Sequence, residues 1–155
     1  MQMHVTRWGN RPIPFGCAVA MAGRFGFDLD LRRLTDDERA VCRRAVEDDH
    51  AIRDLVQHGD LHRLVSPIGS DRAALAHLDP AGERAVVFAW VFPADDAAEA
   101  PARVELPEPL RGRAWEVVDR TPGRGPDTPV PMLVDDALAW PDGPYGALVV
   151  ELRPA

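Results

Sequence analysis

Two patterns of apolar and polar positions divide the chain near residue 58. Before it, a run of small apolar residues spans 17–22, and an amphipathic repeat spans 35–58. After it, short apolar runs alternate with turn-forming residues. Apolar stripes with a period near 3.6 residues indicate helices, whereas short apolar runs bounded by turns indicate strands. We therefore predict an α+β fold with two domains, 1–58 and 59–155.

The run CAVAMA at 17–22 shows no alternation of apolar and polar residues. We interpret it as a β-strand that is covered on both faces. The glycines of the next segment permit a sharp turn, so we expect a loop that presents Arg24, Phe25 and Phe27. A strand of this kind needs a neighbour at each edge. Residues 1–58 are therefore expected to belong to a larger α/β body that covers their apolar surface.

A helix is predicted to begin after Thr35 and to end at Gly59. Thr35 and Glu38 have the spacing of a capping box, in which each side chain bonds the backbone N–H of the other residue. Glycine is the residue that most often ends a helix. Only Asp48 interrupts the apolar positions of the repeat, and Asp49 is expected on the solvated side.

Six apolar runs in the second domain are predicted to be strands, because turn residues separate them at short intervals. They are DLHRLVS, RAALAHL, RAVVFAWVF, ARVEL, AWEVVD and GALVVEL. This spacing is typical of an antiparallel β-sandwich. In the third run, Val86, Phe88 and Trp90 share one face. We expect that face to point into the sandwich, together with Val117 and Val149.

Charge and composition exclude several classes of function. The net charge of -7 disfavours nucleic acid and anionic membranes as partners. No apolar run approaches the roughly 20 residues that span a bilayer. Cys17 and Cys42 lack the spacing of metal ligands, and we interpret both as core thiols of a reducing compartment. A cytoplasmic location without a metal or cofactor is the resulting expectation.

Two segments of the first domain carry a family resemblance. HVTRWGN, which starts at His4, matches a His-Val-Ser type segment that an Asn follows, with Thr6 in place of Ser. AMAGRFGFDLDL, which starts at Ala20, matches an Ala-Met-x-Gly-x-Phe-Gly-x-x-Leu-Asp-Leu type run. Both segments resemble the late catalytic region of the microbial α-galactosidases of glycoside hydrolase family 36. The resemblance covers residues 1–92 well and is looser beyond them.

The resemblance implies the end of a (β/α)8 barrel, with its last strand, loop and helix, followed by a C-terminal antiparallel β-sandwich. Active sites of such barrels lie at the carboxyl ends of the strands. The segment after residue 22 would then lie near the mouth of a sugar pocket. The implied substrate contacts at the pocket rim are His4, Trp8, Asn10, Arg24 and Phe25. A purely structural role for this loop remains the alternative.

The resemblance also implies two catalytic aspartates, one in a Lys-x-Asp type motif and one in a Ser-Asp motif. Retaining hydrolysis needs two carboxyl groups about 5–5.5 Å apart. The chain has no lysine, and its one Ser-Asp pair, at 70–71, lies in the predicted β-domain. Asp28 and Asp30 are better interpreted as turn residues that pair with Arg32 or Arg33. We therefore assign no catalytic residue to this chain.

We expect the chain to be part of a hydrolase for raffinose- or melibiose-type α-galactosides and to be inactive alone. Its expected partners are the rest of the catalytic domain, a second copy, and a galactoside bound only in the complete barrel. The alternative is a non-catalytic β-sandwich module that binds a glycan or a protein.

Overall fold

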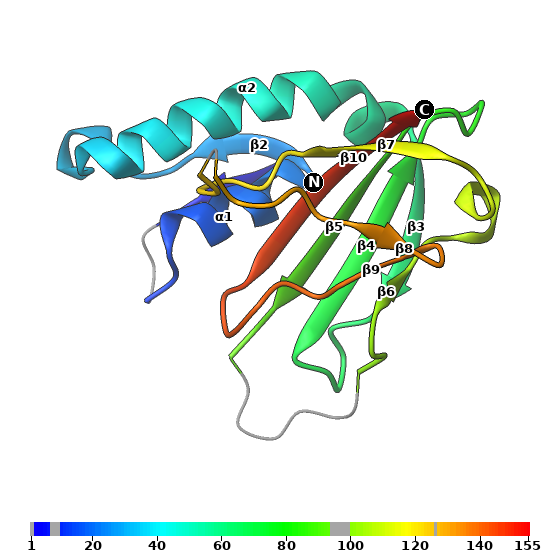
Figure 1. The fold of residues 1–155 in the computed structure, drawn as a ribbon. Helices are drawn as coiled ribbons and strands as arrows, with labels where there is room; N and C mark the ends of the chain where they lie inside the picture. Colours follow the sequence, from blue (N-terminus) through cyan, green and yellow to red (C-terminus); the bar gives the residue numbers. More distant parts are fainter. Residues whose placement is uncertain (1, 7–9, 94–99, 126) are drawn as a thin grey trace.

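A computed structural model describes residues 2–6, 10–93, 100–125 and 127–155 (Figure 1). A central antiparallel sheet has the strand order β3-β4-β5-β10-β7. The helices and a parallel pair of strands, β1-β2, cover one face, and a small sheet with the order β6-β9-β8 lies against the other. The helices and strands are β1 (Gln2–Val5), α1 (Ile13–Met21), β2 (Arg24–Phe27), α2 (Asp36–His58), β3 (Asp60–Val65), β4 (Arg72–Leu78), β5 (Ala85–Val91), β6 (Val104–Glu105), β7 (Trp115–Asp119), β8 (Leu133–Val134), β9 (Ala137–Leu138) and β10 (Ala147–Pro154), with 3-10 turns at Leu31–Arg33 and Glu108–Leu110.

The N-terminal segment has the order β1-α1-β2-α2, and the prediction for 17–22 is wrong. These residues lie in helix α1 rather than in a strand. Pro12 and Pro14 suit the first turn of a helix, and alanine and methionine favour its interior. The helix is buried on most sides, so its sequence lacks a polar stripe. An all-apolar run of this length does not distinguish a buried helix from a buried strand.

The predicted loop after residue 22 contains strand β2, which pairs in parallel with β1. Successive residues of a strand point to opposite faces, and the two faces of β2 meet different neighbours. Phe25 and Phe27 pack into the core cluster below the helices, whereas Gly26 is paired with His4 on the opposite face. The segment therefore forms two successive strand-helix units, where the sequence predicted one.

Helix α2 confirms the predicted capping box. The Thr35 hydroxyl accepts from the Glu38 N–H at 3.2 Å, and the Glu38 carboxylate accepts from the Thr35 N–H at 2.8 Å. Gly59 ends the helix as predicted. The expectation for Asp49 is wrong, because its side chain is only 3% exposed and bonds Arg53 at 2.6 Å. An arginine one turn away neutralises the carboxylate there.

All six predicted strands of the second domain are present, as β3, β4, β5, β6, β7 and β10. Val86, Phe88 and Trp90 do share one face, with Val149 beside them. That face contacts the helices, however, and Val117 lies on the side of the small sheet. Both faces of the central sheet are covered, so alternation alone does not tell which layer each face meets.

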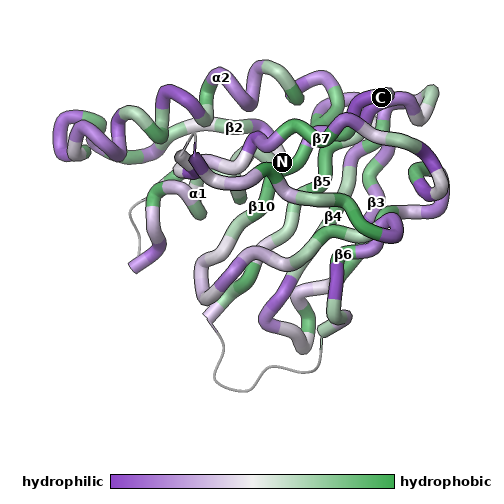
Figure 2. Tube along the Cα trace, viewed as in Figure 1, coloured by the Kyte–Doolittle hydropathy of each residue, from purple (hydrophilic) through white to green (hydrophobic). Residues whose placement is uncertain are grey.

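The hydropathy of the chain follows this layering (Figure 2). Apolar residues run along the central strands, and polar residues recur along α2 at the outer surface. In the described part of the chain, no helix combines the length and the apolar character that crossing a membrane requires.

Candidate functional site

The face of the β1-β2 pair that points away from the core carries the first candidate residue. His4 pairs with Gly26 in the parallel register and is exposed. A Cβ atom at Gly26 would lie 3.0 Å from Cδ2 of His4, so the imidazole lies directly over the glycine backbone. A side chain at position 26 would displace this ring. Glycine at position 26 therefore leaves room for the His4 ring.

The carboxyl ends of β1 and β2 meet at one edge, because the two strands are parallel. The N–H of Asp28 donates to the carbonyl of Val5 at 2.9 Å and joins the two strand ends. Asn10 lies exposed in the turn that precedes α1, and Asp28 is exposed directly after β2. The Asn10 amide and the Asp28 carboxylate are groups that can hydrogen-bond hydroxyls. Sequence reasoning assigned Asp28 to a turn and to a salt bridge with Arg32 or Arg33.

The predicted set of rim residues is not brought together as a whole. Arg24 begins β2 and so lies at the end opposite this edge, although it is exposed. Phe25 is half-buried, and its ring meets that of Phe27 edge to face at 5.0 Å between centroids. Trp8 lies outside the described residues. Phe25 and His4 point to opposite faces of the β1-β2 pair, because side chains alternate along a strand. The predicted loop did not include this alternation.

The carboxylate of Asp30 has a structural role, as the sequence indicated. It pairs with Nε of Arg32 at 2.9 Å and also accepts from the Arg32 backbone N–H at 3.1 Å. The Arg32 side chain, followed by its backbone N–H, lowers the pKa of Asp30. Asp30 thereby caps the short 3-10 turn that leads to α2. In the described ranges, no group of three or more His, Cys, Asp or Glu residues is placed to hold a metal ion.

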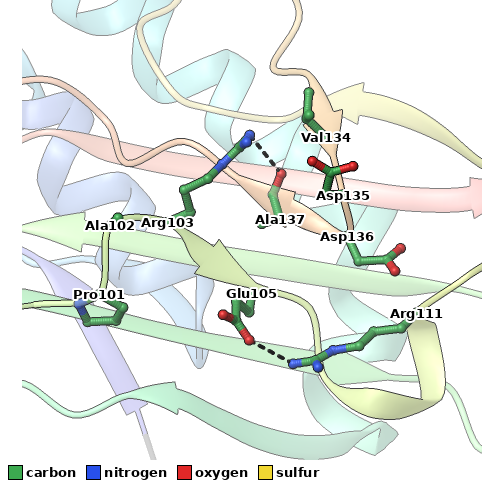
Figure 3. Close-up of a pocket in the computed structure, with 9 residues that line it drawn as sticks. All are labelled: Pro101, Ala102, Arg103, Glu105, Arg111, Val134, Asp135, Asp136 and Ala137. Atoms are coloured by element: carbon green, nitrogen blue, oxygen red, sulfur yellow. Dashed lines mark hydrogen bonds and ion pairs between the residues drawn. The ribbon is translucent and has the colours of Figure 1, made fainter.

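A separate pocket of about 480 Å³ is lined by residues of β6, of the hairpin β8-β9 and of the segments next to β6 (Figure 3). Arg111 bonds Glu105 at 3.0 Å, and Arg103 bonds the Ala137 carbonyl at 3.2 Å. Asp136 accepts from the Gly112 N–H at 2.9 Å. These charged groups are thus already hydrogen-bonded to neighbours within the chain. None of the described residues that line the pocket is aromatic, so it lacks the ring surface on which a sugar face would pack.

A buried ion-pair network joins α2 to the central sheet. Glu151 is fully buried on β10 and accepts hydrogen bonds from Arg84, Arg120 and Arg153 at 2.8–2.9 Å. Arg120 also bonds Asp48 of α2 at 2.9 Å. Burial alone would raise the pKa of Glu151, but the three arginines outweigh it and lower the pKa to about 2. The network fixes the N-terminal units against the sheet.

Comparison with known proteins gives this geometry a context. No family model matches the chain. Alpha-galactosidase 1 from Pediococcus pentosaceus is 36% identical over 73 residues, which are 47% of this chain and 10% of that protein. Alpha-galactosidase AgaA from Geobacillus stearothermophilus is 34% identical over 82 residues, which are 53% of this chain and 9% of that protein. The chain therefore spans about a tenth of these curated relatives.

Solved structures match over the full length of the chain. AgaA from Geobacillus stearothermophilus, as a variant in complex with stachyose, has a TM-score of 0.77 and 25% identity, and the match covers 100% of this chain and 22% of AgaA. AgaB from the same organism shares the fold, with a TM-score of 0.75 and the same coverage at 24% identity. In sequence over about half of its length, and in fold over its full length, this chain is therefore similar to the C-terminal region of α-galactosidases of glycoside hydrolase family 36.

Proposed function

We propose that the chain is the C-terminal part of an α-galactosidase-like retaining glycoside hydrolase. In this proposal, residues 1–58 close a (β/α)8 barrel and residues 59–155 form the C-terminal domain. The order β1-α1-β2-α2, with parallel strands, supports it most strongly, because this order is the repeating unit of such a barrel. In the described residues, β1 and β2 pair only with each other. Their outer edges are where further parallel strands would pair.

The two faces of the β1-β2 pair fit the layers of a barrel. Barrel strands alternate residues between the interior and the outer helix layer. Val5, Phe25 and Phe27 contact the helix layer, so His4 on the opposite face would point into the barrel. Its position near the carboxyl end of β1 is where barrel enzymes build their sites.

We propose that His4 and Asn10 contact the galactoside, with Trp8 as a third contact. His4 lies on the face that would form the interior, and Asn10 lies exposed in the turn between β1 and α1. Phe25 packs toward the helices and Arg24 begins its strand, so neither takes part in the proposed site. The solved AgaA complexes with raffinose and stachyose make α-galactosides of this type the proposed substrates.

The two catalytic carboxylates are proposed to lie in another part of the whole protein. Retaining hydrolysis needs two carboxyl groups about 5–5.5 Å apart, one of them as nucleophile. Asp30 is engaged by Arg32, and Asp48 and Glu151 are buried in the network under α2. These three carboxylates support the fold, the chain has no lysine for a Lys-x-Asp motif, and its one Ser-Asp pair lies in the second domain. The isolated chain is therefore expected to be inactive.

Hydrolysis of p-nitrophenyl α-galactoside by the purified chain tests this proposal. No turnover above the buffer rate is expected. Turnover that a substitution of one of the chain's own Asp or Glu residues abolishes would overturn it. Calorimetric titration with raffinose, and with a glucan as a matched control, distinguishes part of a glycoside hydrolase from a non-catalytic glycan-binding module. Millimolar or tighter binding of either glycan by the isolated chain would favour a glycan-binding module instead.

A further inference from the structure

Two cysteines from different helices lie together in the core beneath the N-terminal units. Cys17 belongs to α1 and is fully buried, and Cys42 belongs to α2 and is 6% exposed. Their thiols are hydrogen-bonded to each other. Neither forms a disulfide, and both belong to the same apolar cluster.

We propose that Cys17 and Cys42 are a redox-sensitive pair that a peroxide converts into a disulfide joining α1 to α2. Hydrogen-bonded thiols need only a small side-chain movement to reach the S–S bond length of about 2 Å. Since the two helices already pack against each other, the bond would form within the present fold. The role of the pair is independent of any activity toward galactosides.

The reaction proceeds in two displacements. The Cys42 thiolate attacks one oxygen of hydrogen peroxide, the O–O bond breaks, and a sulfenic acid forms as hydroxide leaves. The Cys17 sulfur then attacks the Cys42 sulfur, the S–O bond breaks, and the disulfide forms. Both thiol protons end in the two water molecules released. The two sulfurs are oxidised and the two peroxide oxygens are reduced, so the electrons balance.

Burial sets the rate of this reaction. Burial, and next the neighbouring Cys42 thiol, raise the pKa of Cys17 well above its usual range. Because the thiolate is the reactive form, oxidation should be slow at neutral pH and faster as the pH rises. The small exposed fraction of Cys42 makes it the thiol that a small oxidant reaches first. The pair would stay reduced under ordinary reducing conditions and respond only to sustained oxidation.

The disulfide would close the loop that contains β2. Closing a loop of this size restricts the unfolded chain and stabilises the folded one. We expect the melting temperature of the oxidised chain to rise by roughly 5–10 °C. The N-terminal units would then be held together covalently as well as by packing.

The test is to expose the full chain to hydrogen peroxide at pH 7.5 and pH 9, and to map its tryptic peptides without reduction. The expected product is a cross-link between the peptides 8–24 and 40–43, which dithiothreitol reverses and which forms faster at pH 9. Cys42→Ala is the control, and peroxide should not raise its melting temperature. Recovery of both cysteines as alkylatable thiols, or only as sulfinic and sulfonic acids, would overturn the proposal. So would a cross-link that leaves the melting temperature unchanged.

Discussion

Replacing Glu151 by glutamine should destabilise the chain severely, because three arginines converge on a fully buried carboxylate. The fall of its pKa from 4.5 to about 2 corresponds to about 3 kcal/mol of stability. Partial solvent exposure of Arg84 and Arg153 reduces this figure by screening. The neutral amide also removes a counter-charge from Arg120, whose side chain is only 14% exposed, which adds to the cost. We expect a loss of about 2–4 kcal/mol.

Urea denaturation at several pH values measures this loss. With a slope of about 2 kcal/mol/M, the midpoint of Glu151→Gln should fall by about 1–2 M at pH 7. A depressed carboxyl pKa contributes stability that is full above about 4.5 and is lost as the pH falls toward 2. The difference between wild type and variant should therefore shrink across that window.

Glu105→Gln is the matched control. Glu105 also bonds an arginine, at 3.0 Å, but is 70% exposed, so we expect a loss below about 0.5 kcal/mol. Equal losses for the two variants would refute the reasoning. A difference between wild type and Glu151→Gln that stays constant from pH 7 to pH 2.5 would refute the assigned pKa.

Two further predictions concern the ends of α2. Thr35→Ala removes the acceptor for the Glu38 N–H and should lower the free energy of unfolding in urea by about 1 kcal/mol. The control Thr128→Ala, in an exposed loop, should lower it by less than half as much. Equal losses for the two variants would count against the capping box. Gly59→Ala places a Cβ 2.5 Å from the carbonyl oxygens of both Leu55 and Leu78 and should cost more than about 2 kcal/mol, with Gly125→Ala as control. A melting temperature unchanged by Gly59→Ala would contradict the close packing of the end of α2 against β4 at this position.

The sequence predicted elements whose signals are local. The capping box of Thr35 and Glu38, the end of α2 at Gly59 and the six strands of the second domain were all visible in the spacing of residues. Alternation also placed Val86 and Phe88 on one face. Each of these features depends on neighbours within a few positions of the chain.

Features that depend on distant partners escaped prediction. Helix α1 is buried on most sides, so its apolar run carried no helical stripe. The short strand β1 is defined by its pairing with β2, about twenty residues later in the chain. Glu151 on β10 and Asp48 on α2 are linked because Arg120 donates hydrogen bonds to both carboxylates.

The site residues stay predictions, and the structure separates them. The resemblance pointed to His4 and Asn10, which the structure places on the outward face of β1 and in the turn before α1. It also pointed to Phe25, whose neighbour on the core face is Phe27. A strand over 24–27 would have separated these residues by alternation, but the two glycines around Phe25 favoured a loop.

The most direct test of the proposed role is a chimera. The chain would replace the matching C-terminal fifth of AgaA, whose structure it resembles at a TM-score of 0.77. We predict that the chimera hydrolyses p-nitrophenyl α-galactoside, that AgaA truncated at the same point does not, and that His4→Ala lowers the rate of the chimera at least tenfold. A folded chimera without activity, or one whose activity is unchanged by His4→Ala, would contradict the assignment of residues 1–58 to the end of a catalytic barrel.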